Sequence, residues 1–192
     1  MKIIDAHVHL VQYIAGTGAG GELRYSGNGM AEYASGERFQ MLPEEFSQGV
    51  VTPEDILGKM DENGVEKAVL LQGNYFGFQN LYSLQAAARY PKRFRAAASY
   101  DPFCRNKEQI REHLFEKLGC NIVKFEVSTG SGLMSNHFPL PLDGEVMRAE
   151  YDYADEHDLV FVIDIGKCQS ESWQVDRLRN AITGHPGMKF VV

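Results

Sequence analysis

The sequence has few cysteines and no long apolar run. Its three cysteines, Cys104, Cys120 and Cys168, are far apart and form no CxxC pair, so a disulfide framework or a zinc knuckle is not expected. No stretch approaches the roughly 20 apolar residues of a membrane-spanning helix. An aspartate and two histidines stand near the N-terminus, where an export signal has its apolar core. These absences predict a cytoplasmic protein.

The sequence also lacks an excess of positive charge. Its 19 basic and 26 acidic residues give a formal net charge of −7 and an isoelectric point near 5.4, so no basic field attracts phosphate backbones or anionic lipids. Hydrophobic residues make up 44% of the 192 residues, which is enough for a continuous core. We therefore expect a small-molecule substrate, no nucleic-acid or membrane partner, and leave homo-oligomer formation open.

Short β-type runs alternate with helical patterns along the chain. The expected strands are residues 2–8, 67–72, 94–99, 121–126, 159–165 and 188–192. The expected helices are residues 52–63, 80–90, 106–118, 145–157 and 170–183. This rhythm predicts an α/β fold with a parallel sheet, in a TIM-type (β/α) barrel or an open doubly wound sheet. The barrel is favoured because no GxGxxG loop directly follows the first strand and polar residues recur at the strand ends.

The segment of residues 10–51 departs from this rhythm. It is rich in glycine and holds five aromatic residues without clear periodicity: Tyr13, Tyr25, Tyr33, Phe39 and Phe46. An irregular connection of this length is uncommon inside a compact domain and tends to be functional. Because it directly follows the first strand, we expect a long loop or lid over the catalytic face. A partly disordered insertion is the alternative.

The first strand ends in the motif His7-Val8-His9. Side chains alternate along a strand, so Asp5, His7 and His9 share one face. Both imidazoles can then reach a single divalent cation, with Asp5 either supporting them or filling the interior. Two solvent-facing histidines without a function are the alternative. The place of the motif after an apolar strand favours the metal site.

The same alternation selects charged residues in two later strands. Lys124 and Glu126 share a face of the fourth strand, and Asp164 ends the fifth after an apolar run. Glu126 lies nearer the strand end and is the better candidate for catalysis, while Lys124 is expected to be a positioning charge. A structural ion pair is an equal alternative, because buried charges must be paired. Asp164 needs a metal, Lys124 or a backbone turn as its partner.

Four further polar residues are candidates for substrate contacts. Gln72 and Asp101 follow strands, His137 lies in the loop after the fourth strand, and Arg24 lies in the long loop. Asp101 precedes Pro102, so a turn explains it equally well. The other histidines are expected at helix surfaces, and His185 before Pro186 marks a helix exit.

Several stretches resemble a known family. They are, in order, IIDAHVHL, MDENGVEKAVLLQG, YPKRFRAAASYDP, NIVKFE and YDYADEHDLV followed by FVIDIG. Together they resemble the amidohydrolase-related family of metal-dependent (β/α)8-barrel proteins, which includes small aromatic-acid decarboxylases. The resemblance covers nearly the whole chain and implies that His7 and His9 are ligands of zinc or a similar divalent ion.

The chain departs from the family pattern in two respects. The family commonly has a histidine ligand at the end of the fifth strand, where this chain has Asp164, and a carboxylate there shifts the metal preference from zinc toward manganese or magnesium. The family barrel also continues with a histidine after the sixth strand and an aspartate after the eighth. This chain ends at Val192, within the sixth strand. We therefore expect residues 1–192 to form one C-terminally truncated domain with about six of eight βα units, which can be inactive in isolation.

Three functions fit these residues. In the first, a metal-activated water attacks a carbonyl carbon and a C–N or C–O bond is hydrolysed, with Glu126 or the missing aspartate as proton acceptor. In the second, the same site decarboxylates a small aromatic or unsaturated acid. In the third, the chain is a non-catalytic protein whose metal site is incomplete at Asp164.

Overall fold

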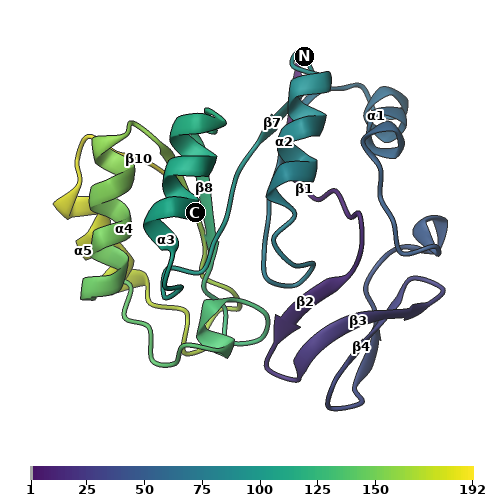
Figure 1. The fold of residues 1–192 in the computed structure, drawn as a ribbon. Helices are drawn as coiled ribbons and strands as arrows, with labels where there is room; N and C mark the ends of the chain where they lie inside the picture. The colour runs from purple at the N-terminus through teal and green to yellow at the C-terminus, as the bar shows by residue number, and fades with distance from the viewer. Residues whose placement is uncertain (1) are drawn as a thin grey trace. The chain divides into compact units, whose positions relative to one another are not determined.

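The computed structural model describes residues 2–192, which form two compact units. Unit 1 ends at Ala97, and unit 2 comprises Ala98–Val192. Each unit contains a parallel sheet of three strands accompanied by helices (Figure 1). The expected alternation of strands and helices is therefore confirmed. None of the helices in residues 2–192 combines the length and apolar character that a bilayer crossing requires.

The parallel sheet of unit 1 contains β1 (Ile3–Val8), β6 (Val65–Leu70) and β7 (Phe94–Ala96), with β6 in the centre. Helix α1 (Pro53–Glu62) precedes β6, and α2 (Asn80–Arg89) connects β6 to β7. The expected start of α1 is confirmed. Thr52 Oγ1 accepts a hydrogen bond from the Asp55 backbone, and the Asp55 carboxylate accepts one from the Thr52 backbone. This capping box satisfies amide groups that the first helical turn leaves without partners.

Residues 10–51 are not an irregular loop, contrary to expectation. They contain four antiparallel strands in the order β2 (Ala15–Gly18), β3 (Gly21–Gly27), β4 (Met30–Tyr33) and β5 (Arg38–Gln40), followed by the 3-10 helix η1 (Glu44–Phe46). The strands are short, so their alternation is hard to detect. The turn between β3 and β4 is Asn28-Gly29, both with positive φ, and this dipeptide is a strong hairpin signal. The role as a lid stays a prediction.

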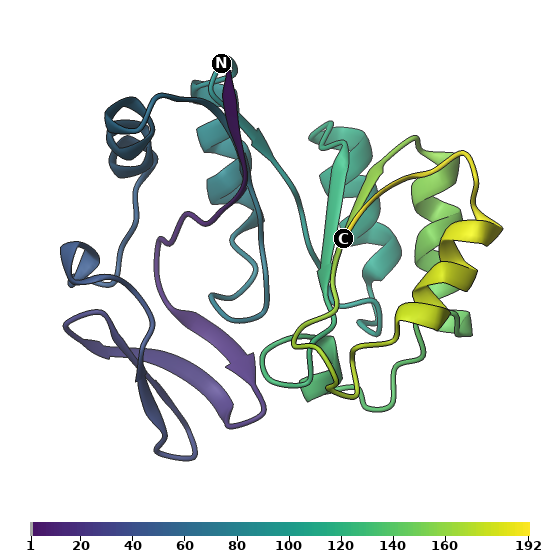
Figure 2. The same cartoon turned by 180° about the vertical axis from the view of Figure 1, so that it is seen from behind.

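The parallel sheet of unit 2 has the order β10 (Lys189–Val191), β9 (Val160–Asp164) and β8 (Ile122–Glu126). Helices α4 (Glu145–Glu156) and α5 (Val175–Gly184) connect the strands and lie side by side on one face (Figure 2). The ring centroid of Tyr151 on α4 lies 4.9 Å from that of Phe161 and 5.6 Å from that of Phe190. Aromatic packing therefore holds α4 on the sheet.

Two helices of unit 2 differ from expectation. The expected helix 106–118 is α3 (Lys107–Arg111) continued by the π-helix η2 (Glu112–Lys117). The helix expected from residue 170 starts only at Val175. Before it, Ser172 Oγ donates to the Ile165 carbonyl and Gln174 Nε2 donates to the Leu140 carbonyl. These side-chain bonds to distant backbone hold the segment in a non-helical conformation.

The strands of residues 2–192 form three sheets, and none of the sheets closes into a barrel. The α/β class and the parallel strands are therefore confirmed. The incomplete barrel stays a prediction.

A buried ion network links the helices of unit 2. The Glu150 side chain is fully buried, forms an ion pair with Arg111 and lies 3.3 Å from Lys107 Nζ. Tyr100 also donates its hydroxyl hydrogen to Glu150. A carboxylate at this depth requires such compensation, because burial removes its hydration.

We predict that Glu150→Ala lowers the free energy of unfolding by about 3 kcal/mol, because it leaves Arg111 buried without its counter-charge. Urea denaturation measures this change. The matched control is Glu156→Ala on the exposed side of the same helix, where we expect a change below about 0.5 kcal/mol. Equal stability of the two variants would show that the network contributes nothing.

Candidate functional site

The structure brings His7 and His9 together at the end of β1. The two Nε2 atoms are 3.0 Å apart. His7 lies in the strand and is exposed, whereas His9 follows the last strand residue and is half-buried. The sequence expectation that two imidazoles converge from one strand is met by this geometry.

A hydrogen bond to the backbone fixes the orientation of His9. Its Nδ1 lies 3.1 Å from the carbonyl oxygen of Leu71, and the Phe76 ring lies 5.1 Å from the imidazole centroid. A carbonyl only accepts hydrogen bonds, so Nδ1 carries the hydrogen and Nε2 of the neutral ring presents its lone pair. Metal-binding histidines commonly have this arrangement. No sequence pattern marks Leu71 as the residue whose backbone carbonyl orients His9.

The spacing of the two nitrogens fits a shared cation. With metal–nitrogen bonds of about 2.05 Å, a separation of 3.0 Å corresponds to a ligand angle of about 94°, between the octahedral and tetrahedral values. Two ligands are fewer than a protein metal site usually provides. In residues 2–192, no three His, Cys, Asp or Glu side chains form a metal-binding group. The pair therefore fits part of a metal site.

Among residues 2–192, the Asp5 side chain forms no hydrogen bond with either imidazole ring. Its Oδ1 accepts a hydrogen bond from the backbone N–H of His7 at 3.0 Å, and its side chain is exposed. Asp5 therefore stabilises the backbone conformation of the strand end.

In unit 2 the structure brings Lys124, Glu126 and Asp164 together. Glu126 and Asp164 are register partners in β8 and β9, and Lys124 Nζ lies 3.8 Å from Glu126 Oε2. Burial lowers the pKa of Lys124, while the nearby carboxylates of Glu126 and Asp164 act in the opposite direction. The Lys124 side chain is only 2% exposed. An ammonium ion at this depth depends on the two carboxylates as counter-charges.

Two serines that the sequence analysis did not single out orient Glu126. Ser128 Oγ donates to Glu126 Oε1 at 3.0 Å, and the Ser131 hydroxyl donates to the same oxygen. Serines in loops are common, so no sequence signal marks them. Asp164 Oδ1 accepts a hydrogen bond from the Gly166 backbone at 2.9 Å, which is the backbone-turn alternative of the sequence analysis.

Asp101 and His137, expected separately, form a pair. His137 Nε2 lies 2.6 Å from Asp101 Oδ2. The Phe103 ring stacks on the imidazole at 4.2 Å between centroids, with 22° between the planes. Asp101 Oδ1 also accepts from the Phe103 backbone at 2.8 Å, so the expected turn is present as well.

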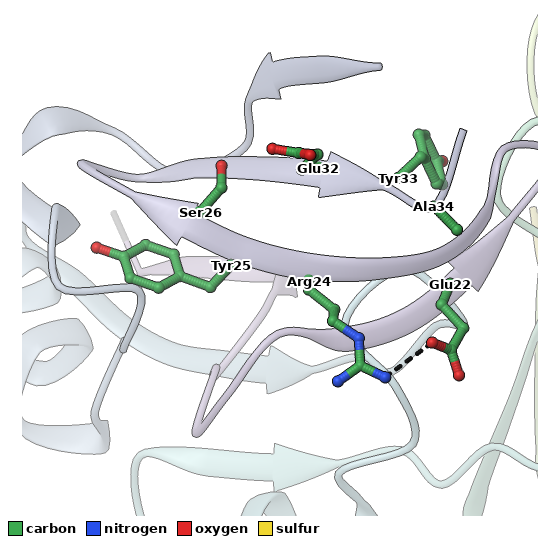
Figure 3. Close-up of a pocket in the computed structure, with 7 residues that line it drawn as sticks. All are labelled: Glu22, Arg24, Tyr25, Ser26, Glu32, Tyr33 and Ala34. Carbon is green, nitrogen blue, oxygen red and sulfur yellow. Dashed lines mark hydrogen bonds and ion pairs between the residues drawn. The ribbon is translucent and has the colours of Figure 1, made fainter. Parts of the chain in front are cut away.

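Arg24 lies on the antiparallel sheet of unit 1, where its guanidinium contacts Glu22 at 2.7 Å. Their hydrogen bond, together with the attraction between the two charges, lowers the pKa of Glu22 and raises that of Arg24. Figure 3 shows the two side chains directed toward each other. They line a shallow pocket together with these residues: Tyr25, Ser26, Glu32, Tyr33 and Ala34. Both charges are largely exposed, so a substrate contact for Arg24 stays a prediction.

Gln72 lies in the interior of unit 1 and is 3% exposed. Its Nε2 donates to the Ser83 hydroxyl, and its Oε1 accepts from the Gln79 backbone at 3.0 Å. These bonds attach β6 to the start of α2. The structure therefore gives Gln72 a structural role, and a substrate contact for it stays a prediction.

Comparison with known proteins identifies a family. The model of the family described as Amidohydrolase matches residues 4–192. No curated protein matches the chain.

Three solved structures illustrate the likeness of fold. A protein from Pseudomonas putida, provisionally named 2-pyrone-4,6-dicarboxylic acid hydrolase, is 16% identical, and the match covers 99% of this chain and 56% of that one with a TM-score of 0.59. The 2,6-dihydroxybenzoate decarboxylase from Rhizobium is 18% identical, and the match covers 77% of this chain and 57% of the decarboxylase with a TM-score of 0.54. An uncharacterized TIM-barrel protein from Bordetella bronchiseptica is 16% identical, and the match covers 71% of this chain and 49% of that protein with a TM-score of 0.58.

At these identities the likeness concerns the fold alone. The chain shares the α/β fold of these proteins, one of which is named as a TIM barrel. It spans 49% to 57% of their length.

We predict that Lys124→Met lowers the free energy of unfolding by about 2 kcal/mol, because it leaves Glu126 and Asp164 without their shared counter-charge. Urea denaturation measures the loss. The control is Lys67→Met on β6, whose lysine is exposed and whose replacement should change stability by less than about 0.5 kcal/mol. If Lys124→Met is as stable as the parent chain, Lys124 does not compensate the carboxylates.

Proposed function

Because the chain belongs to the amidohydrolase family, we propose that it is part of a metal-dependent hydrolase in which His7 and His9 hold a divalent ion. The substrate class is a small carbonyl compound with a C–N or C–O bond to be cleaved. The observation that carries this proposal is the 3.0 Å separation of the two Nε2 atoms, with Nδ1 of His9 bonded to the Leu71 carbonyl. Zinc suits imidazole ligands, while added carboxylates favour manganese or magnesium.

The residues of the chain have different tasks in this proposal. His9 is held by Leu71 and presents Nε2, and His7 supplies the second nitrogen. A bound divalent ion would polarise the carbonyl group and lower the pKa of water. Asp164 is proposed as a further ligand on sequence grounds.

The carboxylate of Glu126 is the proposed proton acceptor in the hydrolysis. The hydroxyls of Ser128 and Ser131 orient it, and Lys124 Nζ lies 3.8 Å from its Oε2. These bonds fix its position, which favours proton transfer along one direction.

Decarboxylation of a small aromatic acid is the second candidate function. The structural likeness to the 2,6-dihydroxybenzoate decarboxylase is comparable to that with the hydrolase from Pseudomonas putida. Proteins named for both reaction classes therefore resemble this chain in fold.

We predict that His9→Ala and His7→Ala each weaken zinc binding by more than about 100-fold, since even changes in residues that only support a ligand cost about 10–100-fold. Equilibrium dialysis followed by elemental analysis measures the affinity. His113→Ala, at an exposed position on η2, is the matched control and should bind like the parent chain. Asp164→Ala tests the proposed third ligand in the same assay.

Unchanged zinc affinity in both histidine variants would exclude this site. A parent chain that binds none of zinc, manganese or magnesium would favour the non-catalytic alternative.

We also predict that the metal-loaded protein opens the lactone ring of 2-pyrone-4,6-dicarboxylate, giving a product heavier by one water with no release of carbon dioxide. Mass spectrometry and carbon dioxide detection measure these products, and 2,6-dihydroxybenzoate is the parallel probe. His9→Ala should abolish turnover, whereas His113→Ala should retain it. Carbon dioxide release from the benzoate, without ring opening of the pyrone, would replace the hydrolase proposal by the decarboxylase one.

A further inference from the structure

Asp101 and His137 share a hydrogen bond that determines which imidazole nitrogen is available for chemistry. A carboxylate only accepts hydrogen bonds, so the 2.6 Å contact between Asp101 Oδ2 and His137 Nε2 places the hydrogen on Nε2. The lone pair of the neutral ring is then on Nδ1. No hydrogen bond among residues 2–192 uses that Nδ1 atom. The imidazole therefore has one nitrogen held by a carboxylate and the other able to accept a proton.

Phe103 holds both members of the pair. Its backbone N–H donates to Asp101 Oδ1 at 2.8 Å, and its ring stacks on the His137 imidazole. The His137 backbone donates to the Leu133 carbonyl at 2.8 Å, at the 3-10 helix η3 (Leu133–Ser135). The orientation of the pair is therefore fixed from three directions. Such preorganisation is what a proton-transfer group requires.

A second histidine–aspartate pair in unit 2 shows what a purely structural pair looks like. His185 Nε2 lies 3.0 Å from Asp152 Oδ1, and His185 Nδ1 lies 2.9 Å from the Ala181 carbonyl oxygen. Burial opposes protonation, but these two bonds dominate and raise the pKa of His185. Both of its nitrogens are occupied by acceptors. In the neutral ring of His185 one nitrogen keeps a lone pair, but this lone pair faces an oxygen atom and is not open to an incoming group, unlike Nδ1 of His137.

The location of the pair also favours a functional role. Asp101 follows the residue Ala98, which bridges to Val123 of β8 in parallel, and His137 lies in the loop after β8. Both side chains thus stand beyond the C-terminal ends of parallel strands, where enzymes of this class of fold place their active sites. Their side chains are 33% and 26% exposed, so a small molecule can reach them.

We propose that Asp101 and His137 form a proton-transfer pair in which His137 Nδ1 takes up a proton and later returns it. In a hydrolysis, the oxygen of the attacking water bonds to the carbonyl carbon. At the same time the water gives one proton to His137 Nδ1. The imidazolium is stabilised by the Asp101 carboxylate. The same proton then passes to the leaving oxygen or nitrogen as its bond to carbon breaks, which regenerates the neutral ring.

The inference rests on the proposed function for the identity of the reaction. The inference makes His137 a second proton acceptor besides Glu126. The two carboxylate oxygens of Glu126 are already engaged by the Ser128 and Ser131 hydroxyls and by Lys124. His137 Nδ1 carries no such bond.

The test measures the reactivity of the Nδ1 lone pair directly, without a substrate. Diethyl pyrocarbonate acylates unprotonated imidazole nitrogens, and mass spectrometry of peptides gives the rate at each histidine. The reaction is run about two pH units above the ordinary imidazole pKa of about 6.5, where an imidazole of ordinary pKa is neutral. His113, which is exposed, reports accessibility, and His185 reports a pair with both nitrogens occupied.

We expect His137 to react at least about threefold faster than His113 and about tenfold faster than His185, because the Asp101 carboxylate stabilises the positive charge that develops on the ring as Nδ1 attacks the reagent. Asp101→Asn should lower the rate at His137 to that of His113. The matched variant Asp152→Asn should leave His137 unchanged. A rate at His137 no higher than at His113 in the parent chain, or a rate that Asp101→Asn leaves unaltered, would overturn the proposal.

The comparison of His137 with His113 and His185 within the parent chain needs no variant, so a folding defect of Asp101→Asn does not affect it. Zinc affinity measured on the same preparations tests the proposed function independently. If the parent chain does not bind zinc but His137 is acylated fast, the metal site alone is refuted. If the parent chain binds zinc but His137 is acylated no faster than His113, the proton-transfer pair alone is refuted.

Discussion

His7 and His9 stand two residues apart on one strand, and this spacing directs both imidazoles to the same side. The strand places the rings next to each other, but it does not decide which nitrogen faces the partner ring. That choice depends on the Leu71 carbonyl at the end of the neighbouring strand β6, which takes the hydrogen of His9 Nδ1. Parallel pairing of β1 with β6 therefore converts a sequence motif into a pair of nitrogens with metal-ligand spacing.

Compensation of buried charge shapes unit 2. Lys124 in the sheet and Glu150 on α4 are both almost inaccessible, and each lies beside groups of opposite charge. The two clusters differ in what surrounds them. Glu150 is enclosed by Arg111, Lys107 and Tyr100 and leaves no access for a ligand. Lys124 lies beside half-buried carboxylates at strand ends, a position in which charge can serve both stability and chemistry.

The two histidine–aspartate pairs show that residue identity alone does not assign a role. His137 and His185 each bond an aspartate through Nε2. The difference is a backbone carbonyl near Nδ1, which His185 has at Ala181. His185 follows a helix, where terminal carbonyls lack partners, whereas His137 lies in a loop. The local backbone therefore decides whether an imidazole is structural or reactive.

The sequence by itself determined the strand and helix order, the capped start of α1, the HxH motif and the charged residues at strand ends, because alternation and capping are local properties. It also contained the Asn28-Gly29 hairpin signal within a segment whose short strands hid their pattern. Only the tertiary structure decided that Asp101 contacts His137 and that Ser128 and Ser131 orient Glu126. It also decided that Gln72 is buried and hydrogen-bonded in the interior, and that the last helix starts at Val175. Each of these depends on hydrogen bonds to partners set by chain packing, and such bonds leave no periodic trace in the sequence.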